Sequence, residues 1–453
     1  MRKTLLVAFA AMFSVASMPA FAGSFIVSIK GNSDRLLADI EAAGGVVTSD
    51  LSVINVLVVD ADDASAFDGI AGIDAVMEDV MIEYREPLKS EVNIDFAAPE
   101  AASPPFTGDD DFFFDLQWGH TAISATDAWA AGHRGAGVRV AVLDSGIDAE
   151  HPDIAPNLNA ALSASFIPGE GWNVRPGTFF NHGTHVAGTI AAADNGFGII
   201  GVAPDAEIIA VKVLSEYSGG GSFSAILNGI VYSAQVGADV INMSLGASIP
   251  RNCGVNVPGN VGNASACADF FSVFARGVKY ARDMGATVIA SAGNDARDLD
   301  HDSSLKKFPA EVNGVLSISA TGPTGWALDP VNADLDKLAS YSNYGQSSID
   351  FSAPGGDYIY PGNDVCAVVV YQYCWAMDMV FSTISGGWSW SAGTSMAAPH
   401  ASGVAALIIG KNGGSMDPQA VEKALRQSAD DLGKAGNDDA HGMGRVNALR
   451  AVE

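Results

Sequence analysis

Ser395 lies in the stretch SAGTSMAAPH, Ser391 to His400, a small flexible turn that leads directly into a long apolar run. A serine at the start of a helix is often only a cap that accepts a backbone N–H. Small neighbours on its N-terminal side leave its hydroxyl accessible, and the helix N-terminus adds partial positive charge. A nucleophilic serine would need a base and an orienting acid from elsewhere in the chain.

Two other segments carry those groups. Asp144 ends the apolar run VRVAVLD, and His182 precedes a glycine turn in NHGTHVAGT. A strand-end aspartate alone is often a helix cap or a turn former. His182 and His185 have a spacing short enough for metal ligands, but the segment lacks the Glu of H-E-x-x-H and a matching Cys/His cluster. Together with Ser395 they supply the acid, base and alcohol of a serine hydrolase.

The segments that must position these residues are short, continuously apolar runs, which are typical of strands buried on both faces. They read GVRVAVLDSG, AEIIAVKVL, ADVINMSLG, ATVIASAGN and VLSISAT. Between them we expect helices near 184–193, 223–237 and 271–285, and a last one from Ser395. This alternation predicts an α/β fold, a doubly wound, mostly parallel sheet flanked by helices. Working sites lie at the carboxyl ends of such strands, where Asp144 and Asn294 both fall.

The N-terminal part divides into three segments before the main domain. A positive start, an apolar stretch and the site Ala20-Phe21-Ala22 predict a secretory signal peptide, cleaved after Ala22. The next segment has the order β-α-β-β-α-β, a small ferredoxin-like α+β arrangement. A stretch rich in Pro, Ala and acid follows, which predicts an exposed linker open to proteolysis. The expected bounds are 1–22 for the signal, 23–87 for the small domain, 88–111 for the linker and 112–453 for the main domain.

Charge limits the partners of the chain. Asp and Glu number 52 against 24 Lys and Arg, which gives a formal net charge of −28 over 453 residues. The resulting field repels nucleic acid and anionic membranes. After the signal, no stretch is long and apolar enough to span a bilayer. We therefore expect an exported monomer that binds neither nucleic acid nor membrane.

Export also gives the four cysteines a role. In an oxidising compartment an even number of cysteines predicts disulfides, and four allow three connectivities. We favour nearest-neighbour pairing, Cys253 with Cys267 and Cys366 with Cys374, over four buried thiols.

Taken together, the motifs resemble the subtilisin family of serine proteases, the subtilases. The matching blocks, in order, are VAVLDSGIDAEHPDI, NHGTHVAGTIA, GVAPDAEIIAVKVL, DVINMSLG, ASAGN and AGTSMAAPHASGVAAL, from about Gln117 to the terminal HGMGRVNALRA. The chain order Asp, His, Ser is also that of subtilisin. The resemblance implies a secreted serine endopeptidase that hydrolyses peptide bonds of proteins. It also implies that residues 23–87 are a propeptide, a folding chaperone and intramolecular inhibitor that the enzyme removes by self-processing at the linker.

The resemblance further assigns roles to single residues. Ser395 attacks the substrate carbonyl, His182 takes and returns its proton, and Asp144 orients the imidazole. Asn294 and the Ser395 backbone N–H stabilise the oxyanion. Stretches of bare backbone bind the extended substrate as an added strand. The implied substrate-binding residues are Ser218, Gly219, Gly220 and Gly221, then Ser244, Leu245 and Gly246, and finally Ser291, Ala292 and Gly293. An ordinary loop is the alternative for the first of these stretches, where the match needs a one-residue gap.

A structural calcium ion is also implied by the resemblance. Asp153 and the side chain of Asn195 would bind it, together with three carbonyl oxygens from the loop AADNGFGII. Those carbonyls belong to Ala193, Phe197 and Ile199. Gln117 is a candidate for one more ligand, and a plain Asn-Gly turn is the alternative for the loop. We expect no organic cofactor.

Two other classes of function compete with this one. A catalytically inactive subtilase fold would serve as a peptide-binding or adhesion module, but all four catalytic positions hold competent residues. An esterase or lipase would use the same triad, but GTSMA is not the G-x-S-x-G elbow of those enzymes. The loops near 249–269 and 356–380 exceed the minimal loops of the family. For the aromatic residues in the second loop, Tyr371, Tyr373 and Trp375, a buried strand is favoured over a lining of the cleft.

Overall fold

The computed structural model describes residues 23–31, 33–83, 89–92, 111–175, 177, 180–251, 264–302 and 304–453. The predicted signal peptide, residues 1–22, lies outside the described residues, as do most of the predicted linker and Cys253. Within the described ranges, no helix has the length and apolar character needed to cross a membrane.

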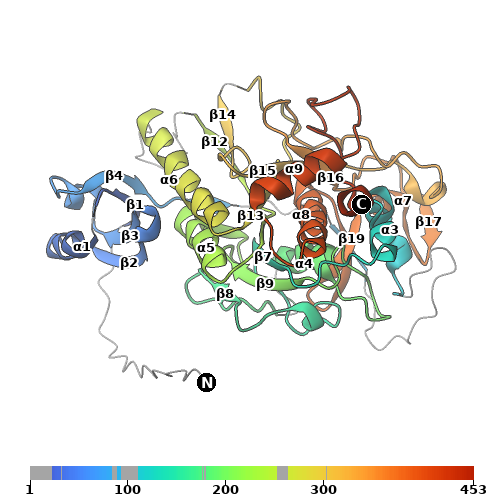
Figure 1. Ribbon diagram of the computed structural model, residues 1–453, viewed down its shortest axis with the longest axis horizontal. Coiled ribbons are helices and arrows are strands. Elements are labelled where there is room, and N and C mark those ends of the chain that lie inside the picture. Colours follow the sequence, from blue (N-terminus) through green and yellow to red (C-terminus); the bar gives the residue numbers. More distant parts are fainter. Residues whose placement is uncertain are drawn as a thin grey trace.

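A seven-stranded sheet with parallel pairing forms the centre of the main domain (Figure 1). Its order is β16-β15-β13-β11-β7-β9-β8, and every neighbouring pair is parallel. The strands in chain order are β7 (Arg139–Asp144), β8 (Ala164–Ser165), β9 (Glu207–Lys212), β11 (Val240–Met243), β13 (Thr287–Ser291), β15 (Leu316–Thr321) and β16 (Phe351–Pro354). The predicted doubly wound α/β fold is confirmed.

Helices cover both faces of this sheet because successive strand side chains point to opposite sides. Val140 and Val142 join one apolar core with helices α4 (His182–Ala191) and α8 (Thr394–Lys411). Ala141 and Leu143, the alternate residues of the same strand, join a second core. Helices α5 (Phe223–Gln235) and α6 (Ala264–Asp283) contribute to that second core. The continuous apolar runs of the sequence are thus buried on both sides.

The remaining elements surround this framework. The helices are α2 (Trp118–Ala122), α3 (Ala125–Ala130), α7 (Cys374–Met377), α9 (Pro418–Ser428) and α10 (Ala448–Val452), with short 3₁₀ turns at Phe114–Leu116, Ala155–Asn157 and Trp326–Leu328. The strands outside the main sheet are β10 (Gly220–Ser222), β12 (Ala247–Pro250), β14 (Leu305–Phe308), β17 (Val365–Val368), β18 (Val370–Tyr373), β19 (Val380–Ile384) and β20 (Gly387–Ser391).

The N-terminal domain is a four-stranded antiparallel sheet in the order β2-β3-β1-β4. Its elements are β1 (Gly23–Ile29), α1 (Ser33–Ala42), β2 (Val46–Leu51), a 3₁₀ turn (Ser52–Ile54), β3 (Val56–Ala61), a 3₁₀ turn (Ala64–Phe67) and β4 (Ile73–Glu78). The predicted second helix is therefore only a 3₁₀ turn. One face of the sheet packs on its own helix, and the other joins the core of α5 and α6. Figure 1 shows this domain beside α6.

Three features differ from expectation. Helix α6 begins at Ala264, earlier than the expected 271, so the last part of the predicted long loop, residues 264–269, is helical. Tyr371 and Tyr373 lie on a strand, but their side chains are exposed, so their assignment to a buried strand is wrong. Residues 89–92 of the predicted exposed linker form strand β6 (Lys89–Val92), paired antiparallel with β20.

Candidate active site

The predicted acid, base and alcohol converge at the carboxyl edge of the sheet. Asp144 is the last residue of β7, and His182 is the first residue of α4. Asn294 follows β13, and Ser395 is the second residue of α8. Because β7, β11 and β13 are neighbours, the residues that follow them meet at one edge.

Asp144 and His182 form a buried hydrogen-bonded pair. His182 Nδ1 lies 2.8 Å from Asp144 Oδ2, and their side chains are 2% and 0% exposed. The other carboxylate oxygen accepts the backbone N–H of Ser145 at 2.7 Å. Phe180 stacks on the imidazole with ring centroids 5.6 Å apart. The ring is therefore held in one orientation, with Nδ1 directed to the acid.

Ser395 is fixed against the strand end that follows β11. Its Oγ donates to the Ser244 carbonyl at 3.2 Å, and its own carbonyl accepts from Ser244 Oγ at 2.7 Å. These two bonds hold the start of α8 beside the backbone of Ser244–Gly246.

Asn294 is oriented by Thr394, a residue that the sequence analysis missed. Asn294 Oδ1 accepts from both the backbone N–H and the Oγ1 of Thr394, each at 2.8 Å. Thr394 Oγ1 in turn accepts the Gly293 N–H at 2.9 Å. With the amide oxygen engaged on one side, the Asn294 NH₂ group is directed to the opposite side. The only signal in the sequence was the position of Thr394 next to Ser395.

The predicted substrate-binding stretches lie at strand ends and edges. Gly220 and Gly221 are part of β10, so an ordinary loop is the wrong description for them, whereas Ser218 and Gly219 lie in the preceding turn. A Cβ on Gly221 would lie 2.0 Å from the Val213 carbonyl oxygen, so this edge requires glycine. The other two stretches adjoin each other, since Ser291 Oγ donates to the Leu245 carbonyl at 3.4 Å. Ala292 and Gly293 continue the stretch that begins at Ser291, and Gly246 ends the stretch that begins at Ser244.

The predicted calcium ligands surround a buried carboxylate. Asp153 Oδ2 accepts from Ile199 N at 3.0 Å and from Trp388 Nε1 at 2.8 Å, while its Oδ1 is buried without a hydrogen-bond partner. Burial, together with repulsion from Asp111, raises the pKa of Asp153 to about 8. A Cβ on Gly198 would lie 2.1 Å from Asp153 Oδ2, so the loop needs glycine there. This environment suits a cation with oxygen ligands.

Asp111, rather than Gln117, is the second side chain at this loop. Asp111 is fully buried, and its Oδ1 accepts the Phe197 N–H at 2.6 Å. Gln117 binds the backbone of Ile200 through both ends of its amide, at 2.8 and 3.1 Å. The Asn195 amide nitrogen donates to the Pro152 carbonyl at 3.3 Å, and the Ala193 N–H donates to the Asp153 carbonyl. In the described part of the chain no three His, Cys, Asp or Glu gather as metal ligands, so backbone carbonyls would have to complete the site.

His185 has a structural role. Its Nε2 lies 3.2 Å from the carbonyl oxygens of both Val380 and Ser389. In the described part of the chain neither His182 nor His185 belongs to a group of three His, Cys, Asp or Glu that could hold a metal, which disfavours the metal alternative.

Of the two predicted disulfides, Cys366–Cys374 is formed, with an S–S distance of 2.04 Å. The other pairing, Cys253–Cys267, involves a residue outside the described part of the chain and stays a prediction.

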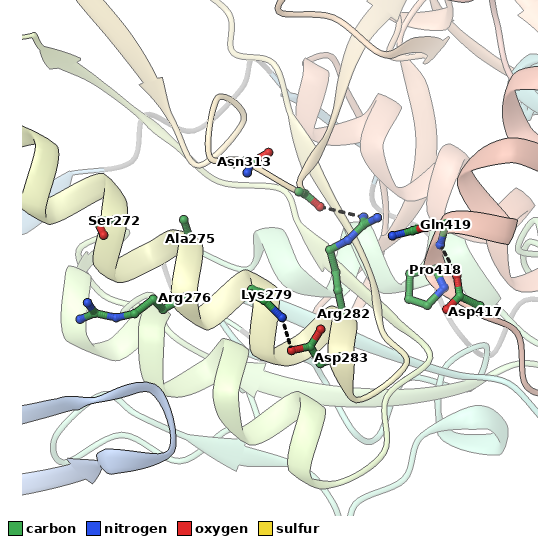
Figure 2. Close-up of a pocket in the computed structure, with 11 residues that line it drawn as sticks. Ser272, Ala275, Arg276, Lys279, Arg282, Asp283, Asn313, Asp417, Pro418 and Gln419 are labelled. Carbon is green, nitrogen blue, oxygen red and sulfur yellow. Dashed lines mark hydrogen bonds and ion pairs between the residues drawn. The ribbon is translucent and has the colours of Figure 1, made fainter. Parts of the chain in front are cut away.

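A groove of about 870 Å³ lies away from this edge, along α6 and the start of α9 (Figure 2). Its basic side chains are already engaged. Lys279 pairs with Asp283 at 2.5 Å, Arg282 donates to the Gly314 carbonyl at 3.0 Å, and Arg276 donates to Ser28 Oγ at 3.0 Å. We therefore assign no ligand to this groove.

Comparison with known proteins decides the family. The sequence model described as the subtilase family matches residues 135–444. The chain belongs to the subtilase family. Thermitase from Thermoactinomyces vulgaris is 31% identical over 349 residues, 77% of this chain and 100% of the relative. Subtilisin Savinase from Lederbergia lenta is 33% identical over 339 residues, 74% of this chain and 98% of the relative. This subtilase is a serine endopeptidase.

Solved structures agree on the fold. The epidermin leader peptide processing serine protease from Staphylococcus aureus matches with a TM-score of 0.73 at 19% identity, over 96% of this subtilase and 98% of that chain. A lanthipeptide protease matches with a TM-score of 0.60 at 27% identity, over 78% and 98% of the two chains. The first match also covers the N-terminal domain.

Proposed function

We propose that this subtilase is a secreted endopeptidase that is made as a self-processing zymogen, with Asp144, His182, Asn294 and Ser395 as its catalytic residues. The observation that carries the zymogen is strand β5 (Met81–Glu83), which pairs antiparallel with β10, the edge expected to bind substrate. The N-terminal domain thus leads into a strand that occupies the place of an extended peptide.

The proposed reaction uses the geometry of the four side chains. His182 Nδ1 faces Asp144, so Nε2 is the nitrogen that removes the proton from Ser395 Oγ as this oxygen attacks the carbonyl carbon. Asp144 stabilises the imidazolium that results. The Asn294 amide and the Ser395 N–H donate to the oxyanion, and His182 then returns the proton to the leaving amine. Water repeats the sequence to release the acyl group.

Contacts between the N-terminal domain and α5 support its role as inhibitor. Ile82, in β5, is 6% exposed and packs in one cluster with Phe223 and Leu245. Asp79 Oδ1 accepts the Ser224 N–H at 2.9 Å, in the first turn of α5. Such contacts cap and bury one face of the enzyme, which is what a folding chaperone and inhibitor would do.

Strand β6 indicates where the proposed maturation cut would fall. Its partner β20 ends at Ser391, four residues before Ser395, and Ser391 pairs with Lys89. The chain is therefore paired with the enzyme twice, at Met81–Glu83 and again at Lys89–Val92, and the second partner strand ends shortly before the proposed nucleophile. Among residues 88–111, this arrangement favours a first cut at the upstream end of the linker.

Calcium is the proposed structural ion. Asp111, Asp153, Asn195 and the carbonyls of Ala193, Phe197 and Ile199 would hold it, and its charge would neutralise two buried carboxylates. It takes no part in the proposed chemistry. Export through the predicted signal peptide places the enzyme outside the cell, where calcium and protein substrates are both available.

Substitution of the nucleophile tests the proposal. Ser395→Ala should leave the full precursor uncut in a protease-free host, whereas the unaltered chain yields a shorter product whose N-terminal sequence reports the cut. A fluorophosphonate probe should label only the unaltered enzyme. Normal maturation of Ser395→Ala, without another protease present, would refute self-processing.

A further inference from the structure

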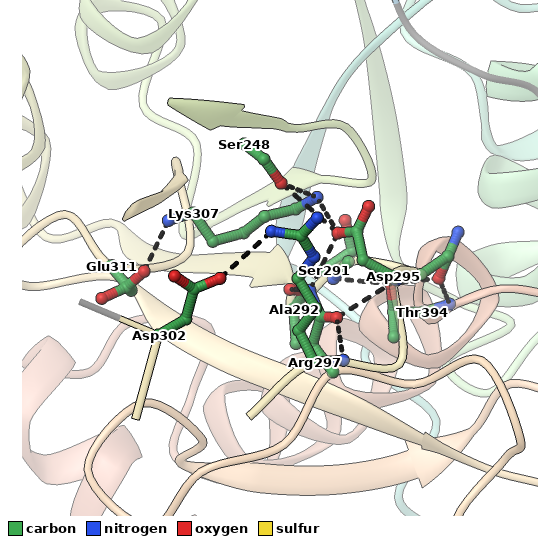
Figure 3. A network of polar contacts seen from close by, with 12 residues as sticks. Ser248, Ser291, Ala292, Asp295, Arg297, Asp302, Lys307, Glu311 and Thr394 are labelled. Atoms are coloured by element: carbon green, nitrogen blue, oxygen red, sulfur yellow. Dashed lines mark hydrogen bonds and ion pairs between the residues drawn. The ribbon is translucent and has the colours of Figure 1, made fainter. Parts of the chain in front are cut away.

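Lys307 is a buried cation beside the proposed oxyanion donor. It lies on β14, and its side chain is only 9% exposed. Strand β14 pairs antiparallel with β12, which continues directly from the substrate-binding stretch Ser244–Gly246. Figure 3 shows the Lys307 side chain extending toward Ser248 and Asp295. Asp295 directly follows Asn294 in the chain.

Two glycines show where the stem of Lys307 runs. A Cβ built on Gly293 would lie 2.2 Å from Lys307 Cε and 2.6 Å from its Nζ. A Cβ on Gly246 would lie 3.7 Å from the same Cε. The lysine therefore fills the space between the two stretches that follow β11 and β13.

The same two stretches also meet one particular side chain of the substrate. The Asn294 amide and the Ser395 N–H mark the oxygen of the carbonyl under attack. The side chain of the residue that owns this carbonyl then lies at Ser244–Gly246, which bonds to Ser395 through Ser244, and at Gly293, which directly precedes Asn294. It meets the Lys307 ammonium group.

The Lys307 ammonium group retains one N–H donor for a substrate side chain. Nζ donates to Asp295 Oδ2 at 2.7 Å and to Ser248 Oγ at 3.3 Å, which uses two of its three N–H groups. Asp295 Oδ2 is itself crowded, because Asn343 Nδ2 also donates to it at 3.2 Å. Partial burial alone would raise the pKa of Asp295, but Lys307 holds it below its ordinary value, so the pair is ionised.

We propose that Lys307 determines which residue this subtilase accepts on the acyl side of the scissile bond, favouring glutamate, then glutamine, over arginine and aromatic residues. The inference relies on the proposed roles of Ser395 and Asn294. A glutamate oxygen would take the third N–H in a charge-assisted hydrogen bond. An arginine would bring a second cation against a buried ammonium group. An aromatic ring would have to displace the lysine stem.

Asp295 is the group that competes with the substrate, and it provides the matched control. Asp295→Asn removes the internal negative charge while it keeps the size of the side chain. The ammonium group then lacks its ionic partner, so the preference for glutamate over glutamine should increase. Lys307→Met should have the opposite effect, because it keeps an unbranched stem without the charge.

The test compares kcat/KM for four peptides that differ only in the acyl-side residue, which is Glu, Gln, Phe or Arg. The unaltered enzyme should cleave the Glu peptide about 10- to 100-fold better than the Phe and Arg peptides, the range expected for a hydrogen bond to a charged group. Lys307→Met should lose that advantage, so that the ratio of its kcat/KM for the Glu peptide to that for the Phe peptide falls by about 10- to 100-fold. Equal or better cleavage of the Arg or Phe peptide by the unaltered enzyme would overturn the proposal, as would an unchanged ratio in Lys307→Met.

Two measures keep the result decisive. Rates are expressed per site titrated with a fluorophosphonate, so absence of labelling counts against the catalytic assignment and not against the pocket. If Lys307→Met does not fold, Asp295→Asn decides alone: a raised Glu-to-Gln ratio supports the proposal, and an unchanged or lowered ratio overturns it.

Discussion

Replacement of Thr394 by valine removes one hydroxyl and keeps the shape of the side chain. That hydroxyl donates to Asn294 Oδ1 at 2.8 Å and accepts from Gly293 N at 2.9 Å. Leaving the buried Gly293 N–H without a partner costs about 1–3 kcal/mol of stability. The Asn294 amide keeps its bond from the Thr394 N–H and loses a neutral hydrogen bond worth about 0.5–1.5 kcal/mol. Converted to a rate, this loss predicts a kcat about 2- to 10-fold lower.

The assay measures kcat per titrated site, and thermal unfolding in parallel. Thr394→Ser is the control, because it keeps the hydroxyl and should stay within about twofold of the unaltered enzyme. Asn294→Ala removes the donor itself and should cost about 10² to 10³ in kcat, a magnitude carried over from subtilisin. A valine variant that unfolds earlier but turns over at the full rate would show that Thr394 only stabilises the strand end. An equal loss in Thr394→Ser would show that the methyl group matters and not the hydrogen bond.

Three further outcomes are expected. Burial raises the pKa of Asp79 in the docked state, although hydrogen bonds from Ser224 oppose the shift. The contribution of Asp79 to docking is therefore complete below the ordinary carboxyl pKa and is lost as pH rises through the raised value. Inhibition by the cut but still bound N-terminal domain should weaken with rising pH, and a pH dependence that persists in Asp79→Asn would contradict this. Calcium at 100 times its Kd should stabilise the protein by about 2.7 kcal/mol, so EDTA should lower the unfolding temperature of the unaltered enzyme. The unfolding temperature of Asp153→Asn should not change with EDTA, and an equal change in the two proteins would eliminate the site. Phe274 is fully buried, and its ring centroid lies 4.5 Å from that of Phe308 and 5.0 Å from that of Phe270. Phe274→Ala should therefore lower the free energy of unfolding by about 3–5 kcal/mol. A loss below about 1 kcal/mol would mean that the site collapses without a cavity.

Most of the main sheet could be predicted because its strands are buried on both faces and so leave continuous apolar runs. The placement of Asp144 and Asn294 at one edge of the sheet followed from the same pattern, since residues at the ends of parallel strands share that edge. The helix α6 was partly missed because its first turns read ASACADF, a stretch without a clear apolar stripe. The exposed hairpin at Tyr371 was misjudged because β-propensity reports a pleated strand and not its burial.

Contacts with residues that are distant in the chain could not be predicted from the sequence. Asp111 ends a stretch of acidic residues, and nothing in that stretch singles out the aspartate that bonds to Phe197. Lys307 sits in a short polar run, and its entry between two glycines depends on the pairing of β14 with β12. Gln117 could be named as a ligand by position alone, but the backbone of Ile200 engages it. In each case the deciding partner lies far away in the chain or on another element.

The proposed removal of the N-terminal domain has a consequence for the apolar surface that this domain shares with α6. At Gly277 of α6 a Cβ would lie 3.9 Å from Ile54 of the N-terminal domain, and 2.7 Å from Leu227 of α5. In the proposed mature enzyme, apolar patches on α5 and α6 would be exposed to water and would become a site for self-association. Residues 112–453 alone hold 33 Asp and Glu against 18 Lys and Arg, a net charge of −15, and this charge opposes association because strongly acidic molecules repel one another in solution. The acidity of this chain would thus act as colloidal protection once the proposed propeptide is gone.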